Sequence, residues 1–98
     1  MLDNKQLPSF VQTAELGSFS KAAQKAFVSV TALIQQINLL EARLKVKLFV
    51  RSHRGLTLTP AGEAFYKDAK YMLEYWRESV SRAWQLKKLI ENGKRQVE

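Results

Sequence analysis

The sequence predicts a mainly α-helical fold with one small β-hairpin, and three observations support this prediction. Apolar residues recur at helical spacing in residues 4–44. The spacing changes to an alternating, strand-like pattern in residues 46–58. From Pro60 to about Asn92, an apolar repeat continues with steps of four and three residues. We therefore expect three shorter helices, a hairpin and one long C-terminal helix.

The first helix is expected over residues 4–16. Its inward stripe follows the spacing i, i+3, i+4, i+7 and consists of Leu7, Phe10, Val11 and Ala14. Gly17 comes next, where the end of a helix favours glycine. If the helix begins at residue 4, Pro8 lies just past the first turn, so we expect a frayed or distorted start.

Two more helices follow in quick succession. Ser18 offers an N-cap for a helix over residues 19–26, and Ser29 offers a second N-cap for a helix over residues 30–44. The inward stripe of the second of these helices is Leu33, Ile37, Leu40 and Leu44. Two short helices joined by only a few residues are typical of a helix-turn-helix.

The opposite face of residues 30–44 is uncharged. It holds Thr31, Ile34, Gln35 and Asn38, with Val30 at the exposed first turn. A merely solvated face would more often carry Lys and Glu. Side-chain amides suit adenine, and methyl-bearing side chains suit the thymine methyl group, in the major groove of DNA. The pattern thus allows either a DNA-recognition helix or an ordinary amphipathic helix with a mixed face.

Residues 46–58 favour a β-hairpin. Residues 46–50 contain Val46, Leu48, Phe49 and Val50, and residues 56–58 alternate like a second strand. The polar stretch 51–55 between them is expected to form the turn, and it contains Arg51, His53 and Arg54. A hairpin directly after a helix-turn-helix is called a wing, and a basic tip suits phosphates or the minor groove. The alternative is a solvated turn, with Arg51 paired inside the chain.

The last helix has a clear start. Thr59 is the expected N-cap and Pro60 takes the first helical position, where its missing N–H costs nothing. Running to about Asn92, the helix would be roughly 50 Å long, too long to be buried against the preceding elements. Its apolar seam has coiled-coil spacing and one polar member: Phe65, Ala69, Met72, Trp76, Ser79, Ala83, Leu86 and Ile90. This repeat predicts pairing with a second copy, and Gly93 is expected to close the helix.

The charge is basic and unevenly distributed. The chain of 98 residues has a formal net charge of +7. Residues 1–59 carry eight Lys or Arg against three Asp or Glu, whereas residues 60–98 carry eight against six. An excess of positive charge favours a polyanionic partner such as DNA or RNA, with a solvated basic surface as the alternative.

Several classes of function are not favoured by the composition. The chain has no Cys and a single histidine, His53, so we expect no disulfide, no metal site and no thiol nucleophile. No paired carboxylates, nucleophile with a base, or phosphate-binding glycine loop is recognisable, so we expect no catalytic residue, no cofactor and no enzyme. No stretch reaches the roughly 20 apolar residues that span a bilayer, and no signal peptide is visible, so a cytoplasmic protein is expected.

Many of these positions together resemble one family. The pattern runs through residues 7–62 in a fixed order: Leu7-x-x-Phe10, Gly17-Ser18-Phe19, Ala22-Ala23, Val28-Ser29, Ala32-Leu33, Gln36-Ile37, Leu40-Glu41, Leu44, Leu48-Phe49, Arg51, Arg54 and Leu58-Thr59-x-Ala61-Gly62. It resembles the N-terminal DNA-binding domain of LysR-type transcriptional regulators, and the long helix after Thr59 resembles the linker helix that pairs their subunits.

The resemblance implies a domain organisation. Residues 1–59 would form a winged helix-turn-helix, residues 60–92 the linker and dimerisation helix, and residues 93–98 the start of a hinge. Longer family members carry an effector-binding domain after this hinge, which the 98 residues do not include, so we expect either a fragment of a longer protein or a natural short relative. A small-molecule effector is therefore expected only where such a domain exists, and a higher oligomer only in a full-length protein.

The resemblance also implies a function and its residues. A homodimer would bind a dyad operator in double-stranded DNA, with the helix over residues 30–44 in the major groove and the wing over 51–55 on the backbone or minor groove. The expected DNA-binding residues are Ser29, Val30, Thr31, Ile34, Gln35, Asn38, Arg51, His53 and Arg54. The expected dimerisation residues are Phe65, Ala69, Met72, Trp76, Ala83, Leu86 and Ile90. Phosphate affinity is expected mainly from Arg43, Lys45, Lys47, Arg51 and Arg54.

The sequence departs from the family where DNA would be contacted. Val30 and Thr31 stand where the family usually has Gln-Pro, and Ile34 and Gln35 stand where it has Ser-Arg. Lys45 replaces the glycine that ends the third helix, and a left-handed conformation there costs on the order of 1 kcal/mol. The lack of arginine predicts half-sites rich in A·T pairs. The alternative function is a protein-interaction module that no longer binds an operator, because an uncharged helix face can dock a partner.

Overall fold

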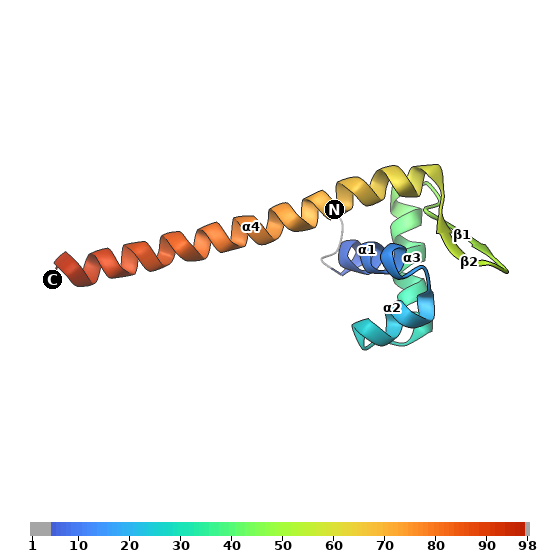
Figure 1. The fold of residues 1–98 in the computed structure, drawn as a ribbon, viewed down its shortest axis with the longest axis horizontal. Helices are drawn as coiled ribbons and strands as arrows, with labels where there is room; N and C mark the ends of the chain where they lie inside the picture. The colour runs from blue at the N-terminus through green and yellow to red at the C-terminus, as the bar shows by residue number, and fades with distance from the viewer. Residues whose placement is uncertain (1–4, 98) are drawn as a thin grey trace.

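The computed structural model describes the backbone of residues 5–97 and the side chains of residues 5–93. Its elements follow in the order α1 (Gln6–Leu16), α2 (Phe19–Ala26), α3 (Val30–Leu44), β1 (Phe49–Ser52), β2 (Gly55–Leu58) and α4 (Pro60–Val97). Figure 1 shows α1, α2, α3 and the hairpin gathered at the N-terminal end of α4, while the rest of α4 extends away from them. The molecule is accordingly elongated, with extents of 66 × 26 × 21 Å. This architecture confirms the predicted winged helix-turn-helix with a long C-terminal helix.

Helix α1 begins later than the sequence predicted. It starts at Gln6, and the expected start at Asn4 lies outside the described residues. Pro8 is therefore the third helical residue, within the first turn, where an N–H has no helical acceptor and its absence costs nothing. The predicted distortion is not needed, and the N–H of Ser9 donates normally to Lys5 O at 3.1 Å. Gly17 ends the helix with φ 63°, as expected.

The two helices of the helix-turn-helix are capped as the sequence predicted. The Ser18 hydroxyl accepts a hydrogen bond from Lys21 N at 3.2 Å, and the Ser29 hydroxyl accepts one from Ala32 N at 3.0 Å. Helix α2 ends at Phe27 with φ 58°, and α3 ends at Lys45 with φ 60°. The left-handed residue expected at the end of α3 is thus confirmed, whereas that at Phe27 was not predicted.

The core lies where the three short helices, the hairpin and the first turns of α4 meet. Its buried members are Phe10, Val11, Ile37, Leu40, Leu48, Phe49 and Ala69. Phe10 is fully buried at the centre, with its ring centroid 5.5 Å from that of Phe49 and 5.3 Å from that of Phe65. A smaller cluster of Ala22, Ala23 and Leu33 joins α2 to α3. The core thereby fixes the orientation of α3 and the wing relative to α4.

The hairpin differs from the predicted boundaries. Strands β1 and β2 are antiparallel, with Phe49 opposite Leu58 and Ser52 opposite Gly55. The turn therefore contains only His53 and Arg54, which we call the wing tip. Arg51 belongs to β1, not to the turn, and Val46 lies before the strand in an exposed connection.

Helix α4 starts as predicted but does not stop at Gly93. The Thr59 hydroxyl accepts a hydrogen bond from Gly62 N at 2.9 Å and donates one to Lys47 O at 2.7 Å. A Cβ atom on Gly62 would lie 2.1 Å from Leu48 O, so only glycine fits this approach of α4 to the wing. Gly93 was expected to close the helix, yet α4 continues to Val97. One interior glycine costs only about 1 kcal/mol, which does not force a break.

Two of the predicted dimerisation residues face the protomer's own core. Ala69 is fully buried there, so it has no surface to offer a second copy. Phe65 packs its ring against Phe10. The assignment of Ala69 is therefore corrected, whereas Phe65 is only partly buried and stays a prediction. The apolar seam packs on the core where the short helices cover α4, and it is exposed beyond them. Met72 and Trp76 are the first exposed members of the seam, and Leu86 and Ile90 are exposed as well.

Candidate nucleic-acid interface

The side of α3 that points away from the core is open to solvent. We call this surface the outer face of α3, and its members are Thr31, Gln35, Asn38, Leu39 and Ala42, with Val30 and Ile34 along one edge. Four residues predicted for this face, Val30, Thr31, Ile34 and Gln35, lie on it. Ile34 is half-buried and the other three are exposed. Leu39 and Ala42 were not among the predicted site residues. They were missed because the spacing of apolar residues identifies the buried stripe of α3 more clearly than the exposed residues on its opposite side.

Helix α3 is held from behind by α1. The Ser9 hydroxyl donates to Gln36 Oε1 at 2.8 Å, and Arg43 donates to Gln6 Oε1 at 3.4 Å. At its N-terminus, Ser29 acts as a cap through its hydroxyl, so its side chain positions α3. These contacts fix the helix in the fold while its outer face stays accessible.

Arg51 joins the wing to α3 and α2. Its guanidinium donates a hydrogen bond to Asn38 Oδ1 at 3.0 Å and lies 5.0 Å from the centroid of the Phe19 ring. The internal pairing that the sequence left open for Arg51 is therefore the arrangement found. Asn38 keeps its amide N–H groups as donors, in an orientation that Arg51 sets.

A hollow of about 410 Å³ lies between the strands of the wing, the start of α2 and the edge of α3 that carries Val30 and Ile34. Phe19, Val30, Ile34 and Arg51 are among the side chains that line it. At the far end of the wing, both tip residues are exposed. Gly55 has φ 114°, a conformation that L side chains rarely adopt, so the short turn depends on glycine at this position.

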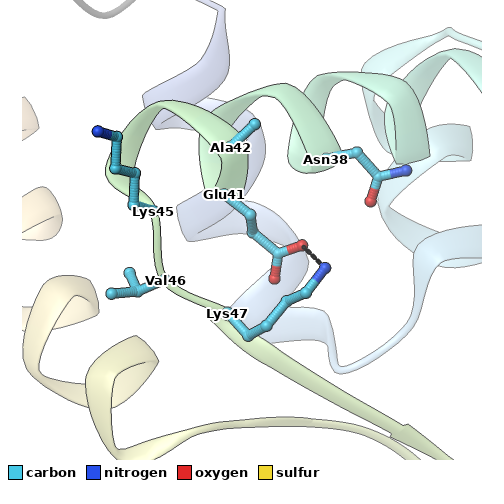
Figure 2. A pocket seen from close by; sticks show the side chains of 6 residues that line it. All are labelled: Asn38, Glu41, Ala42, Lys45, Val46 and Lys47. Atoms are coloured by element: carbon cyan, nitrogen blue, oxygen red, sulfur yellow. Dashed lines mark ion pairs between the residues drawn. The ribbon is translucent and has the colours of Figure 1, made fainter.

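Glu41 is a site residue that sequence reasoning missed. Its side chain is 4% exposed, and its Oε2 accepts hydrogen bonds from Leu48 N at 2.8 Å and from Phe49 N at 3.4 Å. Figure 2 shows its other oxygen facing the ammonium group of Lys47, with Nζ 3.8 Å from Oε1. The carboxylate on α3 thus satisfies the backbone donors at the start of the wing. An acidic residue one turn before the end of α3, just ahead of the strand, was the available signal.

The basic residues divide into two groups by their contacts. Arg43, Lys47 and Arg51 each contact another side chain of the protein, as described above. All five basic residues, Lys45 and Arg54 included, are exposed. The residues predicted to contact phosphates therefore do not form one cluster: Arg43, Lys45 and Lys47 lie at or just after the C-terminal end of α3, Arg51 lies on β1 and Arg54 lies at the wing tip.

The comparison with known proteins agrees with this geometry. The model of the bacterial regulatory helix-turn-helix proteins of the lysR family matches residues 4–63. The chain belongs to the LysR family. Its similarity to the HTH-type transcriptional regulator TfdS of Cupriavidus pinatubonensis is 46% identity over 82 residues, or 84% of this chain and 28% of that relative. The HTH-type transcriptional activator AllS of Klebsiella pneumoniae is 38% identical over 97 residues, or 99% of this chain and 35% of that relative.

Solved structures of this LysR family include domains bound to DNA. A crystal structure of the CbnR DNA-binding domain in complex with DNA has a TM-score of 0.79 and 42% identity, covering 83% of this chain and 93% of that chain. The BenM DNA-binding domain with benA site 1 DNA has a TM-score of 0.83 and 33% identity, covering 86% of this chain and 94% of that chain. The match to nearly the whole of both domains confirms the fold of this LysR-family chain.

Two further properties of the described part of the molecule bear on its class. Among the helices that the structure describes, none has the length and apolar character needed to cross a membrane. Within the described side chains, no three His, Cys, Asp or Glu residues are grouped so that they could hold a metal ion.

Proposed function

We propose that this chain is the DNA-binding portion of a LysR-type transcription regulator and binds a specific duplex sequence. The observation that carries the proposal is the exposed, uncharged outer face of α3 beside an exposed basic wing tip. In this arrangement α3 enters the major groove, where its amides and methyl groups face base edges. The wing tip follows the backbone or enters the minor groove, where Arg54 and His53 meet phosphates.

The relatives support the proposal. TfdS and AllS are named as transcriptional regulators, and the CbnR and BenM domains were solved with DNA. The chain spans 28% of the length of TfdS and 35% of the length of AllS. The proposal accordingly concerns the DNA-binding portion alone. This portion acts by binding, without a catalytic step, and we infer a cytoplasmic location for it.

We further propose that α4 pairs two copies. Beyond the core, its seam exposes Met72, Trp76, Leu86 and Ile90, and Trp76 exposes 67% of its surface. Large apolar side chains at heptad spacing on an isolated helix indicate a partner helix. Two copies related by a twofold axis would present two α3 helices, so the operator would be a dyad.

Salt dependence of binding tests this function. We expect the affinity for a duplex selected from a random pool to fall steeply with salt, because Lys and Arg displace counterions from phosphates. Arg54→Ala should weaken binding to all duplexes alike and reduce the slope of log K against log salt by about one unit. Lys88→Ala, which removes the same charge from α4, should leave the slope unchanged. A chain that selects no duplex, or binds with no salt dependence, would overturn the proposal in favour of a protein-interaction module.

A further inference from the structure

An apolar side chain stands on the surface that would meet the bases. Leu39 is 54% exposed, a larger exposed fraction than that of Val30, the other exposed large apolar residue of α3. It lies four residues after Gln35, and residues at this spacing are neighbours on one side of a helix. A hollow of about 360 Å³ is lined by Gln35, Asn38 and Leu39. Two amides and one branched aliphatic group therefore share one recess on the outer face of α3.

The recess has a fixed wall. Asn38 is held by the 3.0 Å hydrogen bond from Arg51, so its amide cannot turn toward Leu39 without breaking the link to the wing. The opposite side of the helix is anchored by Ile37 and Leu40, both fully buried. Leu39 is thus presented to solvent by a helix that the core holds in one orientation, and its exposure does not come from a loose segment.

The chemistry of this recess matches an A·T pair better than a G·C pair. In the major groove, adenine presents N7 and the N6 amino group to an amide, and thymine presents a C5 methyl group to an apolar side chain. Leu39 carries no charge or hydrogen-bonding group, so it would gain nothing from a phosphate. We propose that Leu39 is a further specificity-determining residue, contacting the methyl group of a thymine next to the base pair that Gln35 contacts. This inference rests on the proposed DNA-binding function.

The test removes the thymine methyl group from the DNA and, separately, the Leu39 side chain proposed to contact it from the protein. In the duplex that the wild-type chain selects, each thymine is replaced in turn by uracil, which lacks only the C5 methyl. Burial of one methyl-sized group corresponds to about a fourfold change in Kd. We expect one thymine in each half-site at which uracil weakens the wild type about fourfold and leaves Leu39→Ala unaffected. At that same thymine, Gln35→Ala should remain sensitive to uracil.

Two controls separate contact from folding. Leu39→Met keeps an apolar side chain of similar volume and should retain sensitivity to uracil. Val46→Ala truncates another exposed apolar residue, just after α3, and should behave as the wild type. If Leu39→Ala and the wild type respond equally to uracil at every position, Leu39 makes no methyl contact and the inference is wrong, while DNA binding itself stands. If the wild-type chain selects no duplex, the proposed function and this inference both fail.

Discussion

The guanidinium of Arg51 on β1 donates a 3.0 Å hydrogen bond to Oδ1 of Asn38 on α3. The bond joins the wing to the helix proposed to enter the major groove. Since the guanidinium also lies over the ring of Phe19, three elements meet at one cation. A displacement of the wing would therefore reorient Asn38 on the outer face of α3. The contacts of α3 with the major groove and the contacts of the wing with the DNA backbone are thereby coupled.

The link predicts coupled effects of Arg51 and Asn38. Arg51→Ala should lower the free energy of unfolding by about 0.5–1.5 kcal/mol, because an exposed hydrogen bond and a cation–π contact are lost. It should also change the salt slope less than Arg54→Ala does, because Arg51 is committed to internal contacts. A double-mutant cycle with Asn38→Ala, measured by urea unfolding and DNA titration, should be non-additive. Strictly additive effects would mean that the two residues act separately.

The buried carboxylate of Glu41 predicts a larger loss of stability. Glu41→Ala leaves the N–H of the fully buried Leu48 without its acceptor, at a cost of about 1–3 kcal/mol. Glu41→Gln keeps one carbonyl acceptor and should lose less. Glu74→Ala, at an exposed position of α4, is the matched control, and urea unfolding measures all three. Equal midpoints for the Glu41→Ala and Glu74→Ala variants would contradict the assigned role.

The contact between α1 and α4 predicts a pH dependence. Tyr66 donates a 2.7 Å hydrogen bond to Glu15, and this bond raises the pKa of Tyr66 above its ordinary value of 10.0. Attraction to Tyr66 and then to Glu15 also raises the pKa of Lys70, whose Nζ lies 3.5 Å from Glu15. Because the folded-state pKa values of Tyr66 and Lys70 are both raised, the stabilisation that these two groups give to the fold is complete below about pH 10. It is lost as the pH rises through their folded-state pKa values.

Tyr66→Phe should therefore be less stable than the wild type at pH 8 and lose less stability between pH 8 and pH 11. Urea unfolding of both chains at the two pH values checks this expectation. If the two chains lose the same stability over that interval, the hydrogen bond to Glu15 contributes nothing.

The seam on α4 predicts a homodimer that charges disrupt. Met72→Glu combined with Trp76→Glu would place two carboxylates in an apolar interface, which is a costly burial. Sedimentation velocity should report a dimer for the wild type and a monomer for this variant. Gln85→Glu adds a charge on another side of α4 and should remain dimeric. A dimeric Met72→Glu/Trp76→Glu variant would remove α4 from the interface.

Local signals made much of the fold predictable from the sequence. Ser18, Ser29 and Thr59 each cap a helix through their own hydroxyl, and such caps depend on residues within one turn. The start of the first strand was harder to predict, because the backbone N–H of Leu48, just before β1, donates to the side chain of Glu41 on α3. Nothing in the sequence marked Phe27 as a left-handed residue, since glycine is absent there.

The candidate site was predictable in its position more than in its contacts. Spacing placed Gln35 and Val30 on the exposed side of α3, and the structure agrees. A heptad repeat cannot distinguish a residue that packs in its own core from one that meets a second copy, so Ala69 was misassigned. The partners of Arg51 come from two other elements, and only the folded arrangement brings them together.

Selection of bound duplexes from a random pool, with the wild type and with Gln35→Ala, tests the central claim most directly. The outer face of α3 offers amides and methyl groups but no arginine, the usual partner of guanine. We predict a dyad with half-sites rich in A·T pairs, and a loss of roughly 1–3 kcal/mol for Gln35→Ala at one A·T position. Half-sites rich in G·C pairs that tolerate Gln35→Ala would contradict the account, even if the fold and the dimer proved correct.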